Sequence, residues 1–574
     1  MLSRIVTLGI FLFWTVLWLS SFSLIGSWSE EEAIFLYEPI YVVRIDKGED
    51  GYYPLYNDPK YGPSVAVVKY YYHQTIKTFS KPLPPKYSVE FKGKRFPLIH
   101  WLQLGPGYIY PRWIIFSVFK SLFGHSLLSF RISGLLVSLT TLLGIFIFCH
   151  KFFNRRIAIF STALFSTVTF FFIFSIPADL FQYQSFTMCA IWSLLFLFLW
   201  RESKKNLYFV LFLIFVCFGI SNHLRFLGFL ASLSLALIIL KIKLPLRYSH
   251  VAIFVLFLAL TLSPYIMHSI DSPNFERTEI GWMGIAPVLE GDSFDAAKTI
   301  FSRFLSTFKT AYDIQNAISQ HIESLLLNFD SKGVFTQLDF YRGSFKPSFI
   351  YFIPFLLGTI TTLVLKNPFI PRLFIPLVIL IYWLLSFVLT PSTMFTSTNL
   401  PWQYLGILPL FCISLVRFLD FLCGKGRFFM IFAYILFLLS SSLQVLQTQK
   451  ILQMIRETTT HISAKAQREL VEYLKEKGIK NPLNLSSRVS LQAISEGEIQ
   501  PFEYFTFLAL NLEKIYEKLE LILRMNIGQY AITGDLIPYS LLMKIASKSG
   551  VSIEKIASFP KGGSPVFTLI RINP

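Results

Sequence analysis

Three consecutive glutamates, Glu30 to Glu32, directly follow the first apolar segment of a chain whose formal net charge is +18. A carboxylate acts as a general base when it lies within hydrogen-bond reach of the proton that it removes. Acidic residues just outside a membrane segment also have a simpler role, because they stay hydrated at the membrane edge and help to keep the orientation of that segment. The cluster therefore has a catalytic interpretation and a structural one.

A second acidic residue, Asp179, lies in the segment "IPADLFQYQ" between two apolar stretches. Pro177 precedes it, and proline interrupts a helix because it has no backbone N–H and clashes with the preceding turn. Asp179 can cap the helix that follows by accepting hydrogen bonds from its first free amides. If Asp179 and the glutamates lie on one membrane face, they are also suited to one site that opens on that face.

Basic residues close to the ends of the apolar segments are candidates for holding an anionic group. Arginine matches two oxygens of a phosphate at once, whereas lysine acts as a point charge. The candidates are Arg95, Lys94, His100, Arg131 and Arg225. Arg131 and Arg225 have an alternative role, because a long cationic side chain at the end of a span can reach the lipid headgroups. A histidine in such a position is also commonly a hydrogen-bonded structural residue.

The elements that position these residues are expected to be membrane helices. The 574-residue chain is 53% hydrophobic and contains 61 phenylalanines, which is too apolar for a soluble protein with one core. We expect a polytopic α-helical membrane protein with about eleven transmembrane helices, the first an uncleaved anchor rather than a signal peptide. The expected spans are 5–25, 132–150, 157–176, 184–200, 207–220, 226–240, 251–270, 348–365, 373–390, 404–423 and 428–446.

The positive charge lies in short clusters between the apolar runs, which does not favour nucleic-acid binding. These clusters are 151–156, 201–205, 241–247, 366–372 and 424–427. By the positive-inside rule they mark cytoplasmic turns. The span count then predicts a cytoplasmic N-terminus, and it places Glu30 to Glu32 on the outer face.

Composition divides the chain near residue 446. We expect a transmembrane domain, 1–446, with external loops 26–113 and 271–346, followed by a small soluble α/β domain, 447–574, on the extracytoplasmic side. In that domain, 464–478 has a helical pattern that ends at a glycine, and 530–534 and 566–572 have strand patterns.

Several motifs occur in the order found in the GT-C superfamily of polytopic glycosyltransferases, in particular the branch with protein O-mannosyltransferases and lipid A aminoarabinose transferases. "EEEAIF" resembles the acidic pair beyond the first span, and "SIPADLFQYQ" the second external acid. "SLFGHSLLSFRISGLL" contains Arg131, "ISNHLRFLG" contains Arg225, and "PWQYLGILPLF" contains Tyr404 of a late span. The resemblance covers about residues 30–411, in order.

The chain departs from the family pattern at three positions. The first acid of the pair, Glu31, replaces an aspartate, which lengthens the side chain by one methylene. Phe96 replaces the basic residue usual before the proline, which leaves Lys94, Arg95 or His100 to substitute for it. Gln403 replaces the basic residue usual before Tyr404.

The resemblance implies a hexosyl or pentosyl transferase that takes a sugar from a polyprenyl-phosphate donor and adds it, with inversion, to a lipid A, glycan or protein acceptor on the extracytoplasmic face. Glu31 would be the base, Glu32 and Asp179 would orient the acceptor or the base, and Tyr404 would contact substrate. The expected location is a bacterial inner membrane, with membrane lipids as further partners and no nucleic acid. Some family members bind a divalent metal ion, and the spacing of carboxylates and histidines here does not decide whether this chain does.

Two other classes fit a polytopic chain with large external loops. A polysaccharide polymerase or ligase would rely on arginines and histidines in those loops. A transporter or flippase of lipid-linked sugars would show inverted repeats and charges at the membrane midplane, whereas the ionisable residues of this chain lie at the ends of spans.

Overall fold

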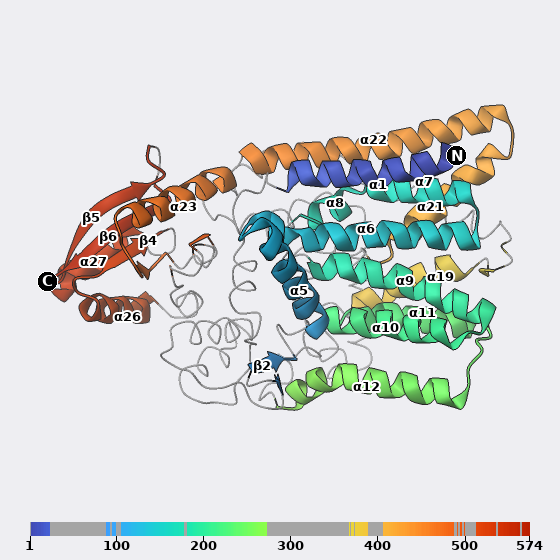
Figure 1. The fold of residues 1–574 in the computed structure, drawn as a ribbon, viewed down its shortest axis with the longest axis horizontal. Coiled ribbons are helices and arrows are strands. Elements are labelled where there is room, and N and C mark those ends of the chain that lie inside the picture. The colour runs from blue at the N-terminus through green and yellow to red at the C-terminus, as the bar shows by residue number, and fades with distance from the viewer. Residues whose placement is uncertain are drawn as a thin grey trace, which may run out of the picture.

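The computed structural model describes the chain in several stretches that together form a helical bundle and a C-terminal sheet (Figure 1). The described residues are 2–22, 88–91, 94–98, 105–176, 181–271, 367, 369–371, 373–388, 406–457, 459–486, 491, 494–495, 499, 512–534, 538–562 and 565–574.

Long apolar helices build the bundle, as the hydrophobic runs predict. Its described helices are α1 (Leu2–Ser21), α5 (Pro106–Phe123), α6 (Leu127–Phe152), α7 (Arg155–Ser166), α8 (Thr169–Phe174), α9 (Phe181–Ser203), α10 (Asn206–Asn222), α11 (Phe226–Ile239), α12 (Tyr248–Asp271), α19 (Phe374–Val388), α21 (Leu408–Cys423) and α22 (Arg427–Glu457). Among the described residues, four segments are long and apolar enough to cross a membrane: Leu127–Phe152, Tyr183–Ser203, Tyr248–Ile266 and Arg427–Leu446. A polytopic helical membrane protein is therefore confirmed, and the number of eleven spans stays a prediction.

One predicted span is wrong in its continuity. The segment expected as a single helix, 157–176, is two helices, because α7 ends at Ser166 and α8 begins at Thr169. The hydroxyl of Ser166 donates a hydrogen bond to the carbonyl of Ala163, and that of Thr167 to the carbonyl of Leu164. Such local side-chain bonds compete with the helical ladder and favour a break.

The turns that carry the basic clusters lie together at one end of the bundle, named here the basic end. The α6–α7, α9–α10, α11–α12 and α21–α22 turns are all at the right of Figure 1, as is the N-terminus. Contacts join them: the Arg201 guanidinium donates to the carbonyl of Phe369 at 2.8 Å, and Arg156 pairs with Asp420 at 3.4 Å. The shared location of the basic clusters is thus confirmed for the described residues.

The helix α5 is not among the predicted elements. It begins at Pro106, inside the expected loop 26–113, and Figure 1 shows it running obliquely across the other helices. Proline is favoured at the first position of a helix because the amide it lacks would have no helical partner there. Gly124, with a φ of +69°, ends the helix in a conformation that favours glycine.

A four-stranded sheet with the order β3-β4-β6-β5 lies at the far end of the chain. Its strands are β3 (Leu483–Asn484), β4 (Tyr530–Thr533), β5 (Ser552–Phe559) and β6 (Phe567–Asn573), and its helices are α23 (Thr459–Glu476), α26 (Leu512–Met525) and α27 (Tyr539–Ser549). The strands β3 and β4 are parallel, and the other pairs are antiparallel. The helix and two strands predicted from the sequence are confirmed.

Helices cover both faces of this sheet. Along β6, Ile570 and Ile572 pack in one core with α26 and α27, whereas Phe567 and Leu569 pack in another with α23. Alternate residues of a strand point to opposite faces, so a strand buried on both faces is apolar throughout. The helix α22 continues past residue 446 without a break and leads toward this sheet (Figure 1).

Candidate functional site

The opposite end of the bundle, named here the loop end, brings together the segments that flank the predicted acids. There α1, α8 and α10 end and α6 and α11 begin (Figure 1). The residues Glu31, Glu32, Asp179, His100 and Tyr404 lie outside the described residues. The loop end is therefore defined by the described residues that surround them in the chain.

Arg131 of α6 lies at the centre of this end. Its side chain is fully buried, and Nη1 donates a hydrogen bond to the carbonyl oxygen of Phe22 at 3.0 Å. Phe22 follows the last turn of α1, where carbonyl groups have no helical partner and a cation is favourable. The alternative that Arg131 reaches out to the lipid headgroups is wrong, because burial and this bond hold the guanidinium inside the protein.

The end of α8 packs against the same helices. The indole Nε1 of Trp18 donates to the carbonyl oxygen of Ser175 at 3.0 Å, and both residues are buried. Gly134 of α6 contacts the same carbonyl so closely that a Cβ would overlap it. The chain toward the glutamates leaves from Phe22, and the chain toward Asp179 leaves just after Ser175. The segments toward Glu31 and toward Asp179 therefore both begin close to Arg131.

A second buried arginine, Arg112 of α5, lies next to this place and was not predicted. Its side chain has no exposed surface, and its Cζ lies 4.2 Å from the ring centroid of Tyr108 and 5.6 Å from that of Phe130. Stacking on an aromatic face stabilises a guanidinium in an apolar setting. Phe130 precedes Arg131 in α6, so Arg112 contacts the same turn of α6 that contains Arg131. The proline at the start of α5 was a signal in the sequence for the beginning of a helix, but it did not indicate that Arg112 lies beside Arg131.

The start of α5 also contacts the end of α10. The amide of Gly105 donates to the carbonyl oxygen of Ser221 at 2.9 Å, and the Tyr265 hydroxyl donates to the same oxygen at 3.3 Å. A Cβ at Gly107 would lie 2.5 Å from the Ser221 hydroxyl oxygen. Glycine at 105 and 107 is therefore needed for this close approach. The helix α5 links the arginines described above to the turn that contains Arg225.

Arg225 lies in the short turn between α10 and α11. It is in electrostatic contact with Tyr183 and Tyr382, and burial lowers the pKa of its guanidinium from the usual value. Burial, and to a lesser degree the Arg225 cation, hold the pKa of His223 well below its usual range, so this imidazole is neutral at pH 7. The preceding Asn222 accepts a hydrogen bond from the Ser185 hydroxyl at 2.8 Å, which fixes the end of α10 against α9.

Lys94 and Arg95 lie in a two-stranded hairpin of β1 (Ser88–Phe91) and β2 (Lys94–Pro97). In the antiparallel register Glu90 is opposite Arg95. The positions of these two side chains are outside what the structure describes, so their contact with substrate stays a prediction.

The described part of the site is cationic and largely shielded from water. Arginines in such a setting attract an anion more strongly than arginines in water do, because the local dielectric constant is lower. Among the described residues, no group of three histidine, cysteine, aspartate or glutamate side chains is placed to hold a metal ion. What this end can do chemically is bind a phosphate next to segments that carry carboxylates.

The model of the dolichyl-phosphate-mannose-protein mannosyltransferase family matches residues 109–268. This range runs from α5 to α12 and includes Arg112, Arg131, Asp179 and Arg225. No curated protein matches the chain in sequence.

Solved structures match over most of the chain. ArnT from Cupriavidus metallidurans bound to undecaprenyl phosphate is similar with a TM-score of 0.50, 12% identity and 98% of both chains covered. The apo state of that ArnT has a TM-score of 0.40 at 11% identity, again over 98% of both chains. The oligosaccharyltransferase AglB from Archaeoglobus fulgidus, in complex with an inhibitory peptide and a dolichol-phosphate, has a TM-score of 0.40 at 11% identity, over 94% of this chain and 69% of AglB. The family model and the fold shared with the undecaprenyl-phosphate-bound ArnT confirm the resemblance to the GT-C superfamily.

Proposed function

We propose that this chain is a membrane glycosyltransferase that moves a sugar from a polyprenyl-phosphate donor to an acceptor at the loop end of the bundle, with inversion at the anomeric carbon. The family model over 109–268 supports this reaction class. The fold supports the type of donor, because the ArnT structure that it resembles is bound to undecaprenyl phosphate.

One observation carries the proposal: buried Arg131 binds the end of α1 at the point from which the segments toward Glu31 and Asp179 both leave. A transferase of this kind needs a carboxylate beside the acceptor hydroxyl and a cation beside the departing phosphate, with the anomeric carbon between them. The loop end supplies the cations directly and carries the acidic residues on the segments that begin there.

In the proposed reaction, a carboxylate oxygen of Glu31 takes the proton of an acceptor hydroxyl. The oxygen of that acceptor hydroxyl attacks the anomeric carbon of the sugar, and the bond between this carbon and the phosphate oxygen breaks as the new bond forms. Glu32 and Asp179 orient the base or the acceptor. The electron pair of the broken bond leaves with the polyprenyl phosphate, whose growing negative charge is stabilised by fixed cations.

The cations that we assign to the phosphate are Arg131, Arg225 and the newly found Arg112, with Lys94, Arg95 and His100 from the first external loop. Tyr404 completes the proposed substrate contacts. The acceptor is a lipid, a glycan or a protein. The loop end is taken to face the extracytoplasmic side of a bacterial inner membrane, with the N-terminus in the cytoplasm and the C-terminal α/β domain outside. The proposal also includes a divalent metal ion, because carboxylates are common ligands of such ions.

The test is transfer by the purified full-length protein supplied with labelled polyprenyl-phosphate sugars and a membrane extract as the source of acceptor. The wild-type protein should transfer label to molecules of the extract. The Glu31→Ala and Asp179→Ala variants should transfer little or none. Full transfer by both variants would contradict the assignment of the acids. Movement of a lipid-linked sugar across the membrane of vesicles, without transfer of the sugar to an acceptor, would indicate a transporter instead.

Mass spectrometry of lipids, glycans and proteins from cells with and without the chain identifies the product. In cells without the chain, we expect one class of acceptor to be lighter by the mass of a single hexose or pentose derivative. This comparison is independent of the substitutions, so it tests the reaction class even if a variant fails to fold.

A further inference from the structure

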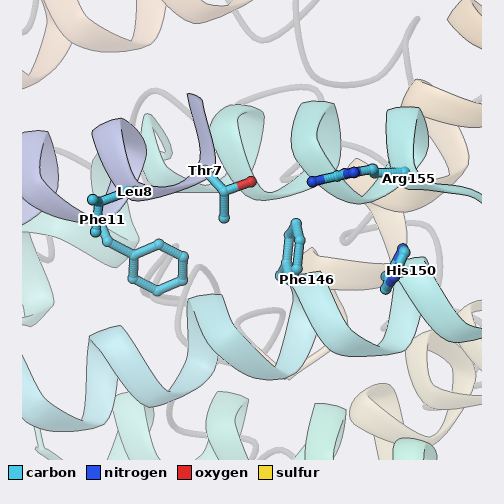
Figure 2. Close-up of a pocket in the computed structure, with 6 residues that line it drawn as sticks. All are labelled: Thr7, Leu8, Phe11, Phe146, His150 and Arg155. Carbon is cyan, nitrogen blue, oxygen red and sulfur yellow. The ribbon is translucent and has the colours of Figure 1, made fainter. Parts of the chain in front are cut away.

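A groove of about 460 Å³ lies at the basic end, far along the helices from the proposed active site. It is bounded by α1, α6 and the start of α7 (Figure 2). Its lining consists of Thr7, Leu8, Phe11, Phe146, His150 and Arg155. This groove has no part in the proposed transfer reaction, so its chemistry needs a separate account.

The groove exists because α1 is packed tightly only toward the loop end. Trp14 and Trp18 are fully buried, with Trp14 against Phe171 and Phe172 of α8. In the first half of the helix, by contrast, none of the described side chains from Ile5 to Phe13 is buried. The basic end of α1 thus leaves space beside α6 and α7 that is open to the membrane environment.

The polar groups of the groove lie at the level of the lipid headgroups, and its apolar groups lie deeper, at the level of the acyl chains. His150 and Arg155 lie at the α6–α7 turn, where lipid headgroups are expected. Phe146 lies one helical turn deeper, with its ring stacked 5.8 Å from the His150 ring, and Leu8 and Phe11 continue the apolar wall. Figure 2 shows Arg155 extending toward Thr7, across from Phe146 and His150.

Among the described residues, no acidic side chain pairs with Arg155, whereas its neighbours Lys151 and Arg156 in the same basic cluster both form ion pairs. Lys151 pairs with Glu202 at 3.2 Å, and Arg156 pairs with Asp420 at 3.4 Å. Within the described residues, the Arg155 guanidinium has neither an ion pair nor a hydrogen bond to the protein. An arginine without a protein partner, next to an apolar groove at a membrane surface, is complementary to an anionic lipid.

We propose that this groove binds an anionic glycerophospholipid of the leaflet at the basic end. The phosphate lies against the guanidinium of Arg155 and the imidazole of His150, and an acyl chain follows Leu8, Phe11 and Phe146. The lipid fills the space that α1 leaves open and ties this helix to α6 and α7. Arginine suits the headgroup, because its planar donors match two phosphate oxygens.

The test is native mass spectrometry of the full-length protein in detergent, titrated with phosphatidylglycerol or phosphatidylcholine. We expect wild type to prefer phosphatidylglycerol, and Arg155→Ala to weaken its binding about fivefold, as the loss of one direct ion pair between an exposed guanidinium and the lipid phosphate predicts. Leu8→Trp keeps the charge but fills the groove, and it should weaken the binding of both lipids. Both residues are exposed, so neither change is expected to unfold the protein.

The matched control is Arg156→Ala, which removes one cation from the same turn but outside the groove; phosphatidylglycerol affinity should stay within about twofold of wild type. Equal losses in Arg155→Ala and Arg156→Ala would overturn the proposal in favour of diffuse attraction to the basic end. Unchanged binding in Leu8→Trp would overturn it as well. A species of two chains that Arg155→Ala dissociates would show that the groove holds a second copy instead of a lipid.

Discussion

Most of the described cationic residues at the two ends of the helical bundle are placed in different ways. Arg417 is an exception, because it is buried near the basic end with its Cζ 4.8 Å from the ring centroid of Phe153. At the basic end, Lys151 and Arg156 are partly exposed and form ion pairs with acids at the surface. At the loop end, Arg112 and Arg131 have no exposed surface, and they contact aromatic rings and a backbone carbonyl. Arginine at the first end costs little to place, whereas burial at the second end carries a large desolvation penalty.

This difference separates cations that set the orientation of the protein in the membrane from cations that bind an anionic substrate. Exposed cations beside spans need only to be present on one side of the membrane to set the topology, and their exact geometry matters little. Buried cations persist only where the surrounding structure holds them, and they are common where a protein binds an anion. The loop end is therefore where substitution should damage activity, and the basic end is where single substitutions should be tolerated.

The largest expected effect is that of the proposed base. Glu31→Ala should lower the rate of sugar transfer by about 10²–10⁴-fold, because a positioned base contributes that much to catalysis. The measurement is the initial rate of label transfer at saturating donor. Glu30→Ala is the matched control, since it removes a carboxylate from the same cluster and should keep most of the activity. Equal loss in both variants would mean that the cluster acts only through its total charge.

Substitution of the buried cation comes next. Arg131→Ala should reduce transfer about 10²–10³-fold, as the removal of one fixed donor to a developing anion does in other enzymes. Arg131→Lys should restore only part of this rate, because lysine does not reproduce the paired donors of the guanidinium. Thermal unfolding of each variant reports the loss of the bond to Phe22.

Loss of stability and loss of catalysis can be told apart at Arg131. If the role is purely structural, Arg131→Ala should lower the unfolding temperature and leave the rate per folded molecule unchanged. If it binds the donor phosphate, the affinity for free polyprenyl phosphate should fall as well. An unchanged affinity would contradict the assignment.

Packing at the loop end gives a smaller effect, on stability. Gly134→Ala places a Cβ against the carbonyl oxygen of Ser175, so α6 and α8 must move apart. Overpacking of this kind costs about 1–3 kcal/mol in the free energy of unfolding. The control is Gly9→Ala in α1, where a Cβ meets nothing within 4 Å and stability should change by less than about 1 kcal/mol. Thermal unfolding in detergent measures both, and equal stability of the two variants would contradict the close packing.

Much of the bundle was predictable because hydrophobic runs determine where membrane helices lie. The segments expected at 184–200, 207–220, 226–240 and 251–270 correspond to α9, α10, α11 and α12 with small shifts at their ends. The helical and strand patterns after residue 446 were equally clear. The segment of α23 has a helical apolar period, and β4 and β6 are short runs rich in apolar and β-branched residues. The two-residue strand β3 is too short to carry any pattern.

The parts that were missed depend on tertiary contacts. The stretch "GPGYIYPRW" at the start of α5 has the composition of a loop, and its helix is held by the approach of Gly105 and Gly107 to the end of α10. Arg112 therefore could not be assigned to the site without the fold. Arg131 and Arg225 were predicted from motif order, but only the structure shows that Arg131 is buried and that Arg225 is partly buried.

The smallest expected effect is at the basic end, where it tests the other half of the comparison. Lys151 and Glu202 form an ion pair at 3.2 Å with side chains 44% and 37% exposed. A double-mutant cycle with Lys151→Ala and Glu202→Ala should give a coupling of about 0.2–1 kcal/mol in the free energy of unfolding, because water and salt screen an exposed pair. Transfer by both single variants should stay within about twofold of wild type. A coupling well above this range, or a large loss of activity, would mean that the surface cations are held as specifically as Arg112 and Arg131. The basic end and the loop end would then not differ in the way argued above.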